Sequence, residues 1–271
     1  MPSPNEITPL QLARLVGTPD APVLVDLRID ADFEADPCFL PAALRHPFID
    51  LELLVPRLAG KRVVVYCQKG RKISQGAMTL LRGRGIEAEA LEGGQVAWRD
   101  AGLPVVDATA LPGLGQGATR WVTRHRPKID RIACPWLIRR FVDAKAEFLF
   151  VPPQDVALVA EKFDAIPFDI EGVRFSHRDD RCSFDTMLAE FGSTSEPLET
   201  LGTVIRAADT NRHDLAPEAA GLLAVSVGLS RMYRDDHAQL DAGMALYDAL
   251  YRWARDGRGE GHDWPSASVM P

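Results

Sequence analysis

Short apolar runs alternate with helix-like segments over residues 1–107 of the chain. Bounded, β-branched runs of four to six residues are typical of buried strands, and the sequence places them at 23–27 and 62–67. Residues 87–91 are expected to form the next strand. Between the last two of these segments, apolar residues recur at helical spacing over residues 74–85, where glycines mark the end of a helix. Buried strands that alternate with helices predict an α/β domain with a central parallel sheet covered by helices on both faces.

The pattern changes after residue 107. Glycine, proline and small residues dominate 108–118, which we interpret as a linker. The rest of the chain, 119–271, contains a few strand-like segments and a helix expected to begin near Pro135, a favoured first-turn residue. Residues 217–256 are mostly helical, with an interruption near Arg234. This pattern predicts a second, mainly α-helical α+β domain.

Composition and charge exclude some classes of protein but do not identify a function. The 271 residues are 46% hydrophobic and 25% charged, with a formal net charge of −7, which argues against nucleic-acid binding over the whole surface. The sequence shows neither a secretory leader pattern nor an apolar run long enough for a membrane span. The cysteines are scattered without CxxC spacing, so we expect reduced thiols in a cytoplasmic protein. The four are Cys38, Cys67, Cys134 and Cys182.

The stretch YCQKGRKIS places a cysteine at the end of an apolar strand, ahead of a glycine-containing loop. Lys69, Arg71 and Lys72 lie in the same loop, and a helix follows it. Ligands bind at the carboxyl ends of parallel strands, and backbone N–H groups and nearby cations stabilise a thiolate or persulfide there. The alternative is a buried structural cysteine, the commoner fate of this residue.

The segment VYCQKGRKISQGAMTLLRGRGIEAEALEGGQVAWRDAGLPV resembles the C-terminal half of a rhodanese (sulfurtransferase) domain, and the resemblance extends over about residues 5–106. It implies that Cys67 is the catalytic residue and carries a sulfane sulfur taken from a small anionic donor. It further implies that the loop after Cys67 binds this sulfur, through Gln68, Lys69, Gly70, Arg71 and Lys72. The last of these is usually arginine in the family, and because lysine lacks the bidentate fork, the donor need not be thiosulfate.

Basic residues are concentrated between positions 120 and 140, where seven lysines and arginines accompany a single acidic residue, Asp130. One interpretation is an oxyanion site that uses Arg124, Arg131 and a helix N-terminus near Pro135. The other is a solvated basic face, or partners for acidic residues elsewhere in the chain. We find no helix-turn-helix with a basic recognition helix, which argues against a nucleic-acid partner.

Histidines and carboxylates recur in three segments of the second half. Candidate metal ligands are His177, Asp209, His237 and Asp241. The last two are four residues apart in a predicted helix and therefore share one face. Histidine with carboxylates suits Zn, Mn or Fe, so we expect a divalent metal as the cofactor. Helix capping by the aspartates and a structural role for the histidines are the alternatives.

The segments WVTRHRPKIDRIACPWLIRRFVD, PFDIEGVRFSHRDDRCSFDTML and RAADTNRHDLAPEAAGLLAVSVGLSRMYRDDHAQLDAGMALYDALYRW resemble the C-terminal domain of the bacterial chromate-resistance protein B family. This resemblance covers about residues 119–265 and implies a role in chromate or other oxyanion resistance. We therefore expect a sulfurtransferase-like protein with a metal or chromate-like oxyanion site in its second domain. The alternatives are a chromate-responsive regulator with a non-catalytic rhodanese module, and a metal-dependent redox protein. The exposed face of the C-terminal helices is a candidate homodimer surface.

Overall fold

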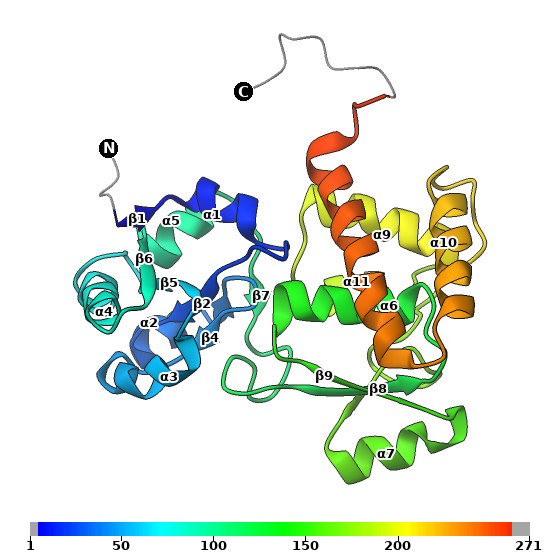
Figure 1. The fold of residues 1–271 in the computed structure, drawn as a ribbon, viewed down its shortest axis with the longest axis horizontal. Helices are drawn as coiled ribbons and strands as arrows, with labels where there is room; N and C mark the ends of the chain where they lie inside the picture. Colours follow the sequence, from blue (N-terminus) through cyan, green and yellow to red (C-terminus); the bar gives the residue numbers. More distant parts are fainter. Residues whose placement is uncertain (1–4, 262–271) are drawn as a thin grey trace.

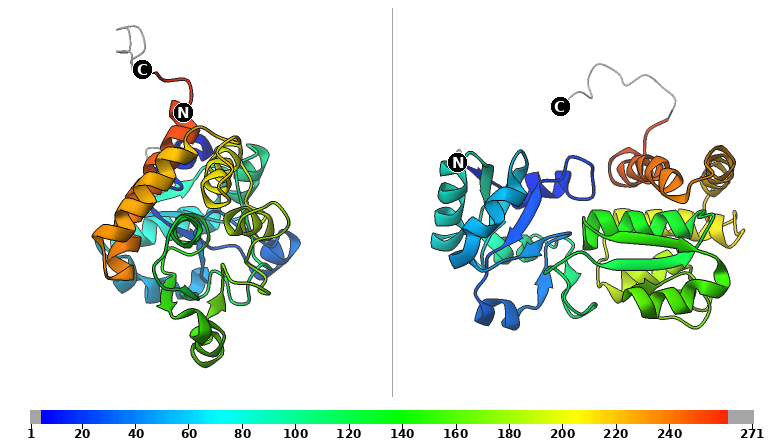
Figure 2. Two further views of the ribbon diagram at one scale, coloured as in Figure 1. Left: turned by 90° about the vertical axis from the view of Figure 1, so that its right-hand side faces the viewer. Right: turned by 60° about the horizontal axis from the view of Figure 1, so that its bottom comes forward.

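A computed structural model of the chain describes residues 5–261. Two domains lie next to each other, with the N-terminal domain in blue to cyan and the C-terminal domain in green to red (Figure 1). The further views in Figure 2 show a separate sheet in each domain. Within the described part of the chain, no helix combines the length and apolar character needed to cross a membrane.

The N-terminal domain is built on a five-stranded sheet in which every neighbouring pair is parallel. In sheet order its strands are β1 (Glu6–Ile7), β6 (Glu87–Leu91), β5 (Arg62–Tyr66), β2 (Val23–Asp26) and β4 (Leu44–Arg45). A short antiparallel ribbon joins β3 (Cys38–Phe39) to β7 (Val106–Asp107). The helices of this domain are α1 (Pro9–Leu15), α2 (Asp30–Ala35), η1 (Phe48–Leu54), α3 (Val55–Leu58), α4 (Lys72–Gly83) and α5 (Gly94–Asp100).

Both faces of this sheet are buried, because successive side chains of a strand point to opposite sides. On β5, Val63 and Val65 pack in the apolar cluster that includes residues of η1, α3 and α4. Val64 and Tyr66 of the same strand belong to the other cluster, which includes residues of α1 and α5. The predicted parallel sheet with helices on both faces is therefore confirmed.

The C-terminal domain is mainly helical around a small sheet, as the sequence predicts. Its parallel strands, in sheet order, are β10 (Ile166–Pro167), β8 (Arg120–Arg124) and β9 (Glu147–Val151). The helices are α6 (Asp130–Leu137), η2 (Ile138–Val142), η3 (Pro153–Asp155), α7 (Val156–Phe163), α8 (Ser183–Glu190), α9 (Glu196–Asp209), α10 (Ala219–Met232), α11 (Asp236–Arg252) and η4 (Trp253–Gly257). The predicted interruption near Arg234 separates α10 from α11.

Trp136 is fully buried in α6 and packs against other helices of this domain. Its ring lies 5.5 Å from that of Tyr251 on α11 and 5.7 Å from that of Phe141 in η2, measured between centroids. Its indole N–H donates to Asp248 Oδ1 over 2.8 Å, and Arg140 donates two hydrogen bonds of 2.8 Å to the same carboxylate. The polar edge of the ring is therefore satisfied inside the core.

The expectation that a helix begins near Pro135 is wrong, because α6 begins five residues earlier, at Asp130, and contains Pro135 in its interior. Proline removes only the hydrogen bond that its own N–H would donate to the carbonyl of residue 131. The helix continues past it as the π-helical turn η2. Within the described chain, no helix N-terminus near Pro135 is therefore present to bind an anion.

The two domains share one hydrophobic cluster, which includes Leu12 and Val16 from the first domain and Phe141 and Tyr251 from the second. Backbone hydrogen bonds also cross between them: Ala42 N donates to the Phe141 carbonyl over 2.6 Å. The intervening residues 108–118 form turns, and Leu111 and Leu114 among them are buried in the same cluster. The domains are therefore packed together through apolar side chains and main-chain hydrogen bonds.

At Gly17, which has a φ of +76°, the backbone of the first domain closely approaches side chains of the second. A Cβ there would lie 2.5 Å from Phe141 Cζ and 2.8 Å from Tyr251 Cε1. We expect Gly17→Ala to lose about 1–2 kcal/mol through left-handed strain and a further ~1–3 kcal/mol through overpacking. Chemical denaturation of the full chain measures the loss.

Gly60→Ala is the matched control for this prediction. Gly60 has φ +70°, but no heavy atom lies within 4 Å of the position that an added Cβ would take. It should show the strain alone, about 1–2 kcal/mol. Equal losses for the two variants would contradict tight packing of the domains at Gly17.

Candidate functional site

Cys67 follows β5 directly and lies in a loop that leads into α4. Only 6% of its surface is exposed, whereas Lys69, Arg71 and Lys72 extend into solvent. Its Sγ is 3.4 Å from Ser74 Oγ in the first turn of α4. In the sheet, β5 lies next to β2. After β2 the chain adds β4 on one side and then β5 and β6 on the other, so the strand order changes direction between β2 and β5. Such a switch point is where open parallel sheets bind their ligands.

Two glycines allow this loop to contact the turn between β6 and α5. Gly70 (φ +61°) and Gly94 (φ +61°) both have left-handed conformations. A Cβ on Gly94 would lie 2.1 Å from the Cys67 carbonyl oxygen and 2.5 Å from Gly70 N. Gln95 N donates to the Cys67 carbonyl over 3.0 Å. The loop is thus held by backbone contacts that a side chain would prevent.

The backbone N–H groups around Cys67 are largely unpaired. Those of Gln68, Lys69 and residues 71–74 have no hydrogen-bond acceptor within the described chain. Lys69, Arg71 and Lys72 form no ion pair with any described residue. Free N–H groups at the start of a helix, with cations beside them, favour a negatively charged group at the cysteine.

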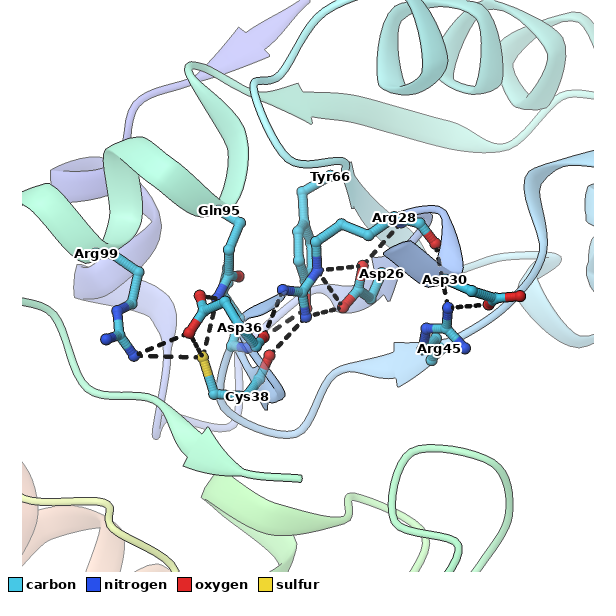
Figure 3. Close-up of polar contacts among 10 residues, drawn as sticks. Asp26, Arg28, Asp30, Asp36, Cys38, Arg45, Tyr66, Gln95 and Arg99 are labelled. Carbon is cyan, nitrogen blue, oxygen red and sulfur yellow. Dashed lines mark hydrogen bonds and ion pairs between the residues drawn. The ribbon is translucent and has the colours of Figure 1, made fainter. Parts of the chain in front are cut away.

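A buried ion pair supports this end of the sheet (Figure 3). Arg28 donates to Asp26 through Nε and Nη2, over distances of 2.6 to 3.0 Å, and both side chains are fully buried. The same guanidinium donates to the carbonyls of Asp36 and Cys38. Burial alone would lower the pKa of Arg28, but the Asp26 carboxylate raises it above the ordinary value. The pair therefore fixes β3 beside the end of β2.

Cys38 belongs to the same network but is a neutral thiol. It donates to Asp36 Oδ1 over 3.2 Å and accepts from Gln95 Nε2 over 3.1 Å (Figure 3). Burial, reinforced by Asp36, raises the pKa of its thiol to about 11. Burial also raises the pKa values of Cys134 and Cys182. All four cysteines are free, and these three are held as structural thiols.

A second cluster of functional groups lies at the carboxyl ends of β8 and β10. Its acidic members are Asp130 at the start of α6, Asp169 after β10 and Asp209 at the end of α9. His177, from the loop before α8, faces all three. Its Nε2 is 3.1 Å from Asp209 Oδ2, 3.5 Å from Asp130 Oδ2 and 3.6 Å from Asp169 Oδ1.

The arginines predicted to bind an oxyanion are part of this cluster. Arg124 Nη2 and Arg131 Nε lie 3.1 and 3.3 Å from Asp169 Oδ2. These contacts, with hydrogen bonds from His177 and Ser183, keep the pKa of Asp169 below its ordinary value despite burial. Several of the other basic residues of this region also have internal carboxylate partners, among them Arg140. These pairs agree with the alternative interpretation of the basic segment, in which its cations are partners for acidic residues elsewhere in the chain.

The charges of this cluster are unusual. Burial raises the pKa of Asp130 well above its ordinary value, and the neighbouring carboxylates of Asp209 and Asp169 raise it further. Its Oδ2 accepts from Ser183 N over 2.6 Å, but its buried Oδ1 has no partner within the described chain. His177 is affected in the opposite direction: hydrogen bonds to Asp169 and then Asp209 raise its pKa to about 10.

Of the four predicted metal ligands, the structure brings together His177 and Asp209 but not His237 and Asp241. His237 packs its ring edge-on against Phe150, and Asp241 lies 3.6 Å from Arg139. Their common helical face therefore points toward β9 and η2. Among the described residues, one set of three or more ligand-type side chains meets within 4.8 Å, and it consists of Asp130, His177 and Asp209.

Asp130 and Asp169 belong to this cluster but were not predicted from the sequence as members of it. Asp130 lies 47 residues before His177, and Asp169 has a left-handed backbone (φ +52°) in a segment without periodicity. A signal for Asp130 was present nonetheless, because it is the single acidic residue among seven basic ones. An acid in that position is a natural partner for several cations.

The cluster has the dimensions of a metal centre. Bonds of about 2.1 Å in a tetrahedral site place neighbouring ligand atoms about 3.4 Å apart. The separations from His177 Nε2 to Asp209 and Asp130 are 3.1 and 3.5 Å. One nitrogen and two carboxylates suit Zn, Mn or Fe.

We predict that His177 in the chelator-treated chain titrates with a pKa of about 10, well above 6.5. Because the pKa is higher in the folded than in the unfolded chain, protonation of His177 stabilises the fold. This contribution is complete below pH 6.5 and is lost as the pH rises through about 10. NMR titration of the ring nitrogens measures it.

Asp209→Asn should move this pKa back toward 6.5, because the variant removes one hydrogen-bonded carboxylate. Asp214→Asn is the control, since Asp214 pairs with Arg212 at the surface. A wild-type His177 that titrates near its ordinary value would contradict the arrangement.

Comparison with known proteins assigns each half. Residues 8–101 match the family model described as "Rhodanese-like domain", and residues 121–254 match "ChrB, C-terminal domain". Protein ChrB of Cupriavidus metallidurans is 35% identical over 193 residues, or 62% of this chain and 58% of that protein. An uncharacterized protein of Synechocystis is 37% identical over 98 residues, or 34% of this chain. The chain thus spans 58% and 51% of the length of these two curated relatives.

Solved structures match the first half. A rhodanese-related protein of Thermoplasma volcanium is 23% identical, covers 38% of this chain and 97% of its own, and has a TM-score of 0.33. The thiosulfate sulfurtransferase of Pseudomonas aeruginosa is 26% identical, covers 41% of this chain and 21% of its own, and has a TM-score of 0.34. The family matches confirm both resemblances seen in the sequence. The chain joins a rhodanese-like domain to a C-terminal domain of the ChrB, or chromate-resistance protein B, family.

Proposed function

We propose that this protein is a sulfurtransferase that carries sulfane sulfur on Cys67 and acts in resistance to chromate or related oxyanions. One observation supports the first part most strongly: the N–H groups of Gln68, Lys69 and residues 71–74 lack acceptors within the described chain. N–H groups that no protein acceptor occupies, at the start of a helix and beside a cysteine, are available to donate to an anionic group. A persulfide on Cys67 is such a group. The link to oxyanion resistance comes from the ChrB-type domain.

The transfer needs no cofactor. The Cys67 thiolate attacks the outer sulfur of an anionic donor of the thiosulfate or thiosulfonate class. An S–S bond forms on Cys67, and the donor's S–S bond breaks, so that the sulfite or sulfinate leaves with the electron pair. A thiolate acceptor then attacks the outer sulfur, forms its own persulfide and returns the electron pair to Cys67. The oxidation state of the protein is unchanged after one cycle.

The exposed cations determine which donors approach. Lys69, Arg71 and Lys72 surround the entrance to the loop without partners among the described residues, so they attract anions. Lys72 presents a single compact charge rather than a planar fork. We therefore place thiosulfonates beside thiosulfate as candidate donors, because they offer fewer oxygens for bidentate recognition.

We expect wild-type protein incubated with thiosulfate or a thiosulfonate to gain the mass of one sulfur atom, and Cys67→Ser to gain none. Gly94→Ala should reduce sulfur transfer on the order of 100-fold, because its Cβ would collide with the Cys67 carbonyl at 2.1 Å and displace the loop. Mass spectrometry of the intact chain and a sulfite-release assay measure these effects.

Gly102→Ala is the control for this displacement, since Gly102 also has a positive φ (+65°) but no heavy atom within 4 Å of an added Cβ. It should retain transfer. Sulfur loading that persists in Cys67→Ser, or no loading of wild type by either donor class, would refute the proposal.

A second activity is favoured by the unpartnered Oδ1 of Asp130, which is 1% exposed as a residue. We propose that Asp130, His177 and Asp209 bind a divalent metal, with the Asp169 carboxylate as a further negative charge beside the same His177 nitrogen and Ser183 supporting Asp130. Bound there, Mn or Fe would supply redox chemistry and Zn a Lewis acid. The two arginines on Asp169 keep that carboxylate ionised at the edge of the site.

Elemental analysis of purified chain should find close to one Mn, Fe or Zn per molecule after reconstitution. His177→Ala should lose it, because the variant removes the nitrogen ligand, whereas His237→Ala should keep it, since His237 packs against Phe150. Asp169→Asn should weaken binding roughly tenfold, because it removes a negative charge next to the cation. Equal metal content in His177→Ala and wild type would refute the site.

A further inference from the structure

A cavity of about 300 Å³ lies between the two domains, away from both candidate sites. Its walls come from the loop between α1 and β2, from β4 and α3, from the turns at residues 115–117, and from η2 and the loop that follows it. Both domains and the segment joining them therefore contribute. A cavity of this size is within the range that binds small organic molecules and is much larger than a single water or a tetrahedral oxyanion requires.

The charge along this cavity is strongly unbalanced. Six arginines and lysines line it, against one acidic residue, Asp143. The Asp143 carboxylate is already occupied, since it accepts from Thr119 N, Thr119 Oγ1 and Lys145 N. Arg140 and Arg139 have acidic partners on α11, namely Asp248 and Asp241. The surplus of positive charge in a chain of net charge −7 is therefore local.

Three of the cations form no ion pair in the described part of the chain: Arg57, Lys61 and Lys145. The first two come from the N-terminal domain and the third from the loop before β9. Lys145 is close enough to Arg57 and Lys61 to be repelled by both, because burial and these two cations lower its pKa although Asp143 acts in the opposite direction. Like charges brought together are destabilising, and an anion between them reduces the repulsion.

A fourth lining cation carries an unpartnered donor. Arg45 binds Asp30 through Nη2, but its Nε is buried and has no hydrogen-bond partner within the described chain. The remaining wall is apolar and includes Val16, Leu24 and Leu54. The lining of the cavity thus combines an unpartnered N–H, three cations that form no ion pair, and apolar side chains.

We propose that this cavity binds an organic phosphate, with the phosphate against Arg57, Lys61 and Lys145 and a compact apolar body against the hydrophobic wall. A phosphate monoester carries nearly two negative charges and several acceptor oxygens near neutral pH, which suits three cations better than a carboxylate or sulfonate. An inorganic oxyanion would contact the cations but would leave the apolar wall of the cavity uncovered. Because both domains line the cavity, the ligand stabilises their association.

Isothermal titration calorimetry of the full chain with phenyl phosphate tests this site, with inorganic phosphate and phenol as partial ligands. One molecule of phenyl phosphate should bind per chain, roughly tenfold or more tighter than inorganic phosphate, because burial of the ring adds to the ionic contacts. Phenol alone should bind more weakly still. Raising the salt concentration should weaken the binding of both phosphates.

The variant Arg57→Gln/Lys145→Gln should bind phenyl phosphate roughly tenfold or more weakly, since it removes two charge-assisted contacts. Both residues are exposed, and neither side chain has a protein partner in the described chain, so the fold should be preserved, which circular dichroism checks. Lys162→Gln, an exposed change on α7 outside the cavity, is the matched control and should bind as wild type does.

Three outcomes would overturn the inference. They are no saturable binding of phenyl phosphate, equal binding by the double variant and wild type, and inorganic phosphate or chromate binding as tightly as phenyl phosphate. The last would assign the cavity to inorganic oxyanions and leave its apolar wall without a role. None of these results depends on sulfur transfer at Cys67 or on metal binding at His177.

Discussion

The packing of α1 and Gly17 against Phe141 and Tyr251 is the constraint on which the rest of the molecule depends. It merges two apolar cores into one cluster and brings the backbone of Ala42 within hydrogen-bond distance of η2. Most of the stabilising free energy of a domain comes from such burial. The positions of the interdomain cavity, of η2 and of the loop around Arg45 are all consequences of this contact.

Both candidate sites lie at the carboxyl ends of parallel strands. Cys67 follows β5, Arg124 is the last residue of β8 and Asp169 follows β10, so each site lies at carboxyl ends of parallel strands where the strand order changes direction. Their polarities are opposite. The loop at Cys67 presents free N–H donors and cations, whereas the cluster at His177 is built on carboxylates. The carboxyl end of the first sheet is therefore suited to an anion, and that of the second sheet to a cation.

Local signals in the sequence predicted much of the fold and the loop at Cys67. The central strands β2 and β5 are short apolar runs, whereas the two-residue strands β1 and β4 are too short to give a signal. The loop at Cys67 was identified through its resemblance to a rhodanese domain, in which glycines such as Gly70 and Gly94 permit a close backbone contact. The second cluster depends on contacts between distant segments. Spacing of four residues placed His237 and Asp241 on one helical face but could not tell which way that face points. Likewise, Pro135 is favoured at a helix start, yet tertiary packing around Trp136 keeps it inside α6.

The segment between the domains has a consequence for how such a chain arises by gene fusion. Leu111 and Leu114 contribute side chains to the common core, and the Gly115 carbonyl accepts from Arg45 N, while a Cβ on Gly115 would lie 2.7 Å from the Phe39 ring. Insertion or loss of a single residue here would shift these groups out of place. We therefore expect recombination at this junction to depend on the number of residues that it adds or removes. The segment belongs to the shared core and does not act as an independent tether between two modules.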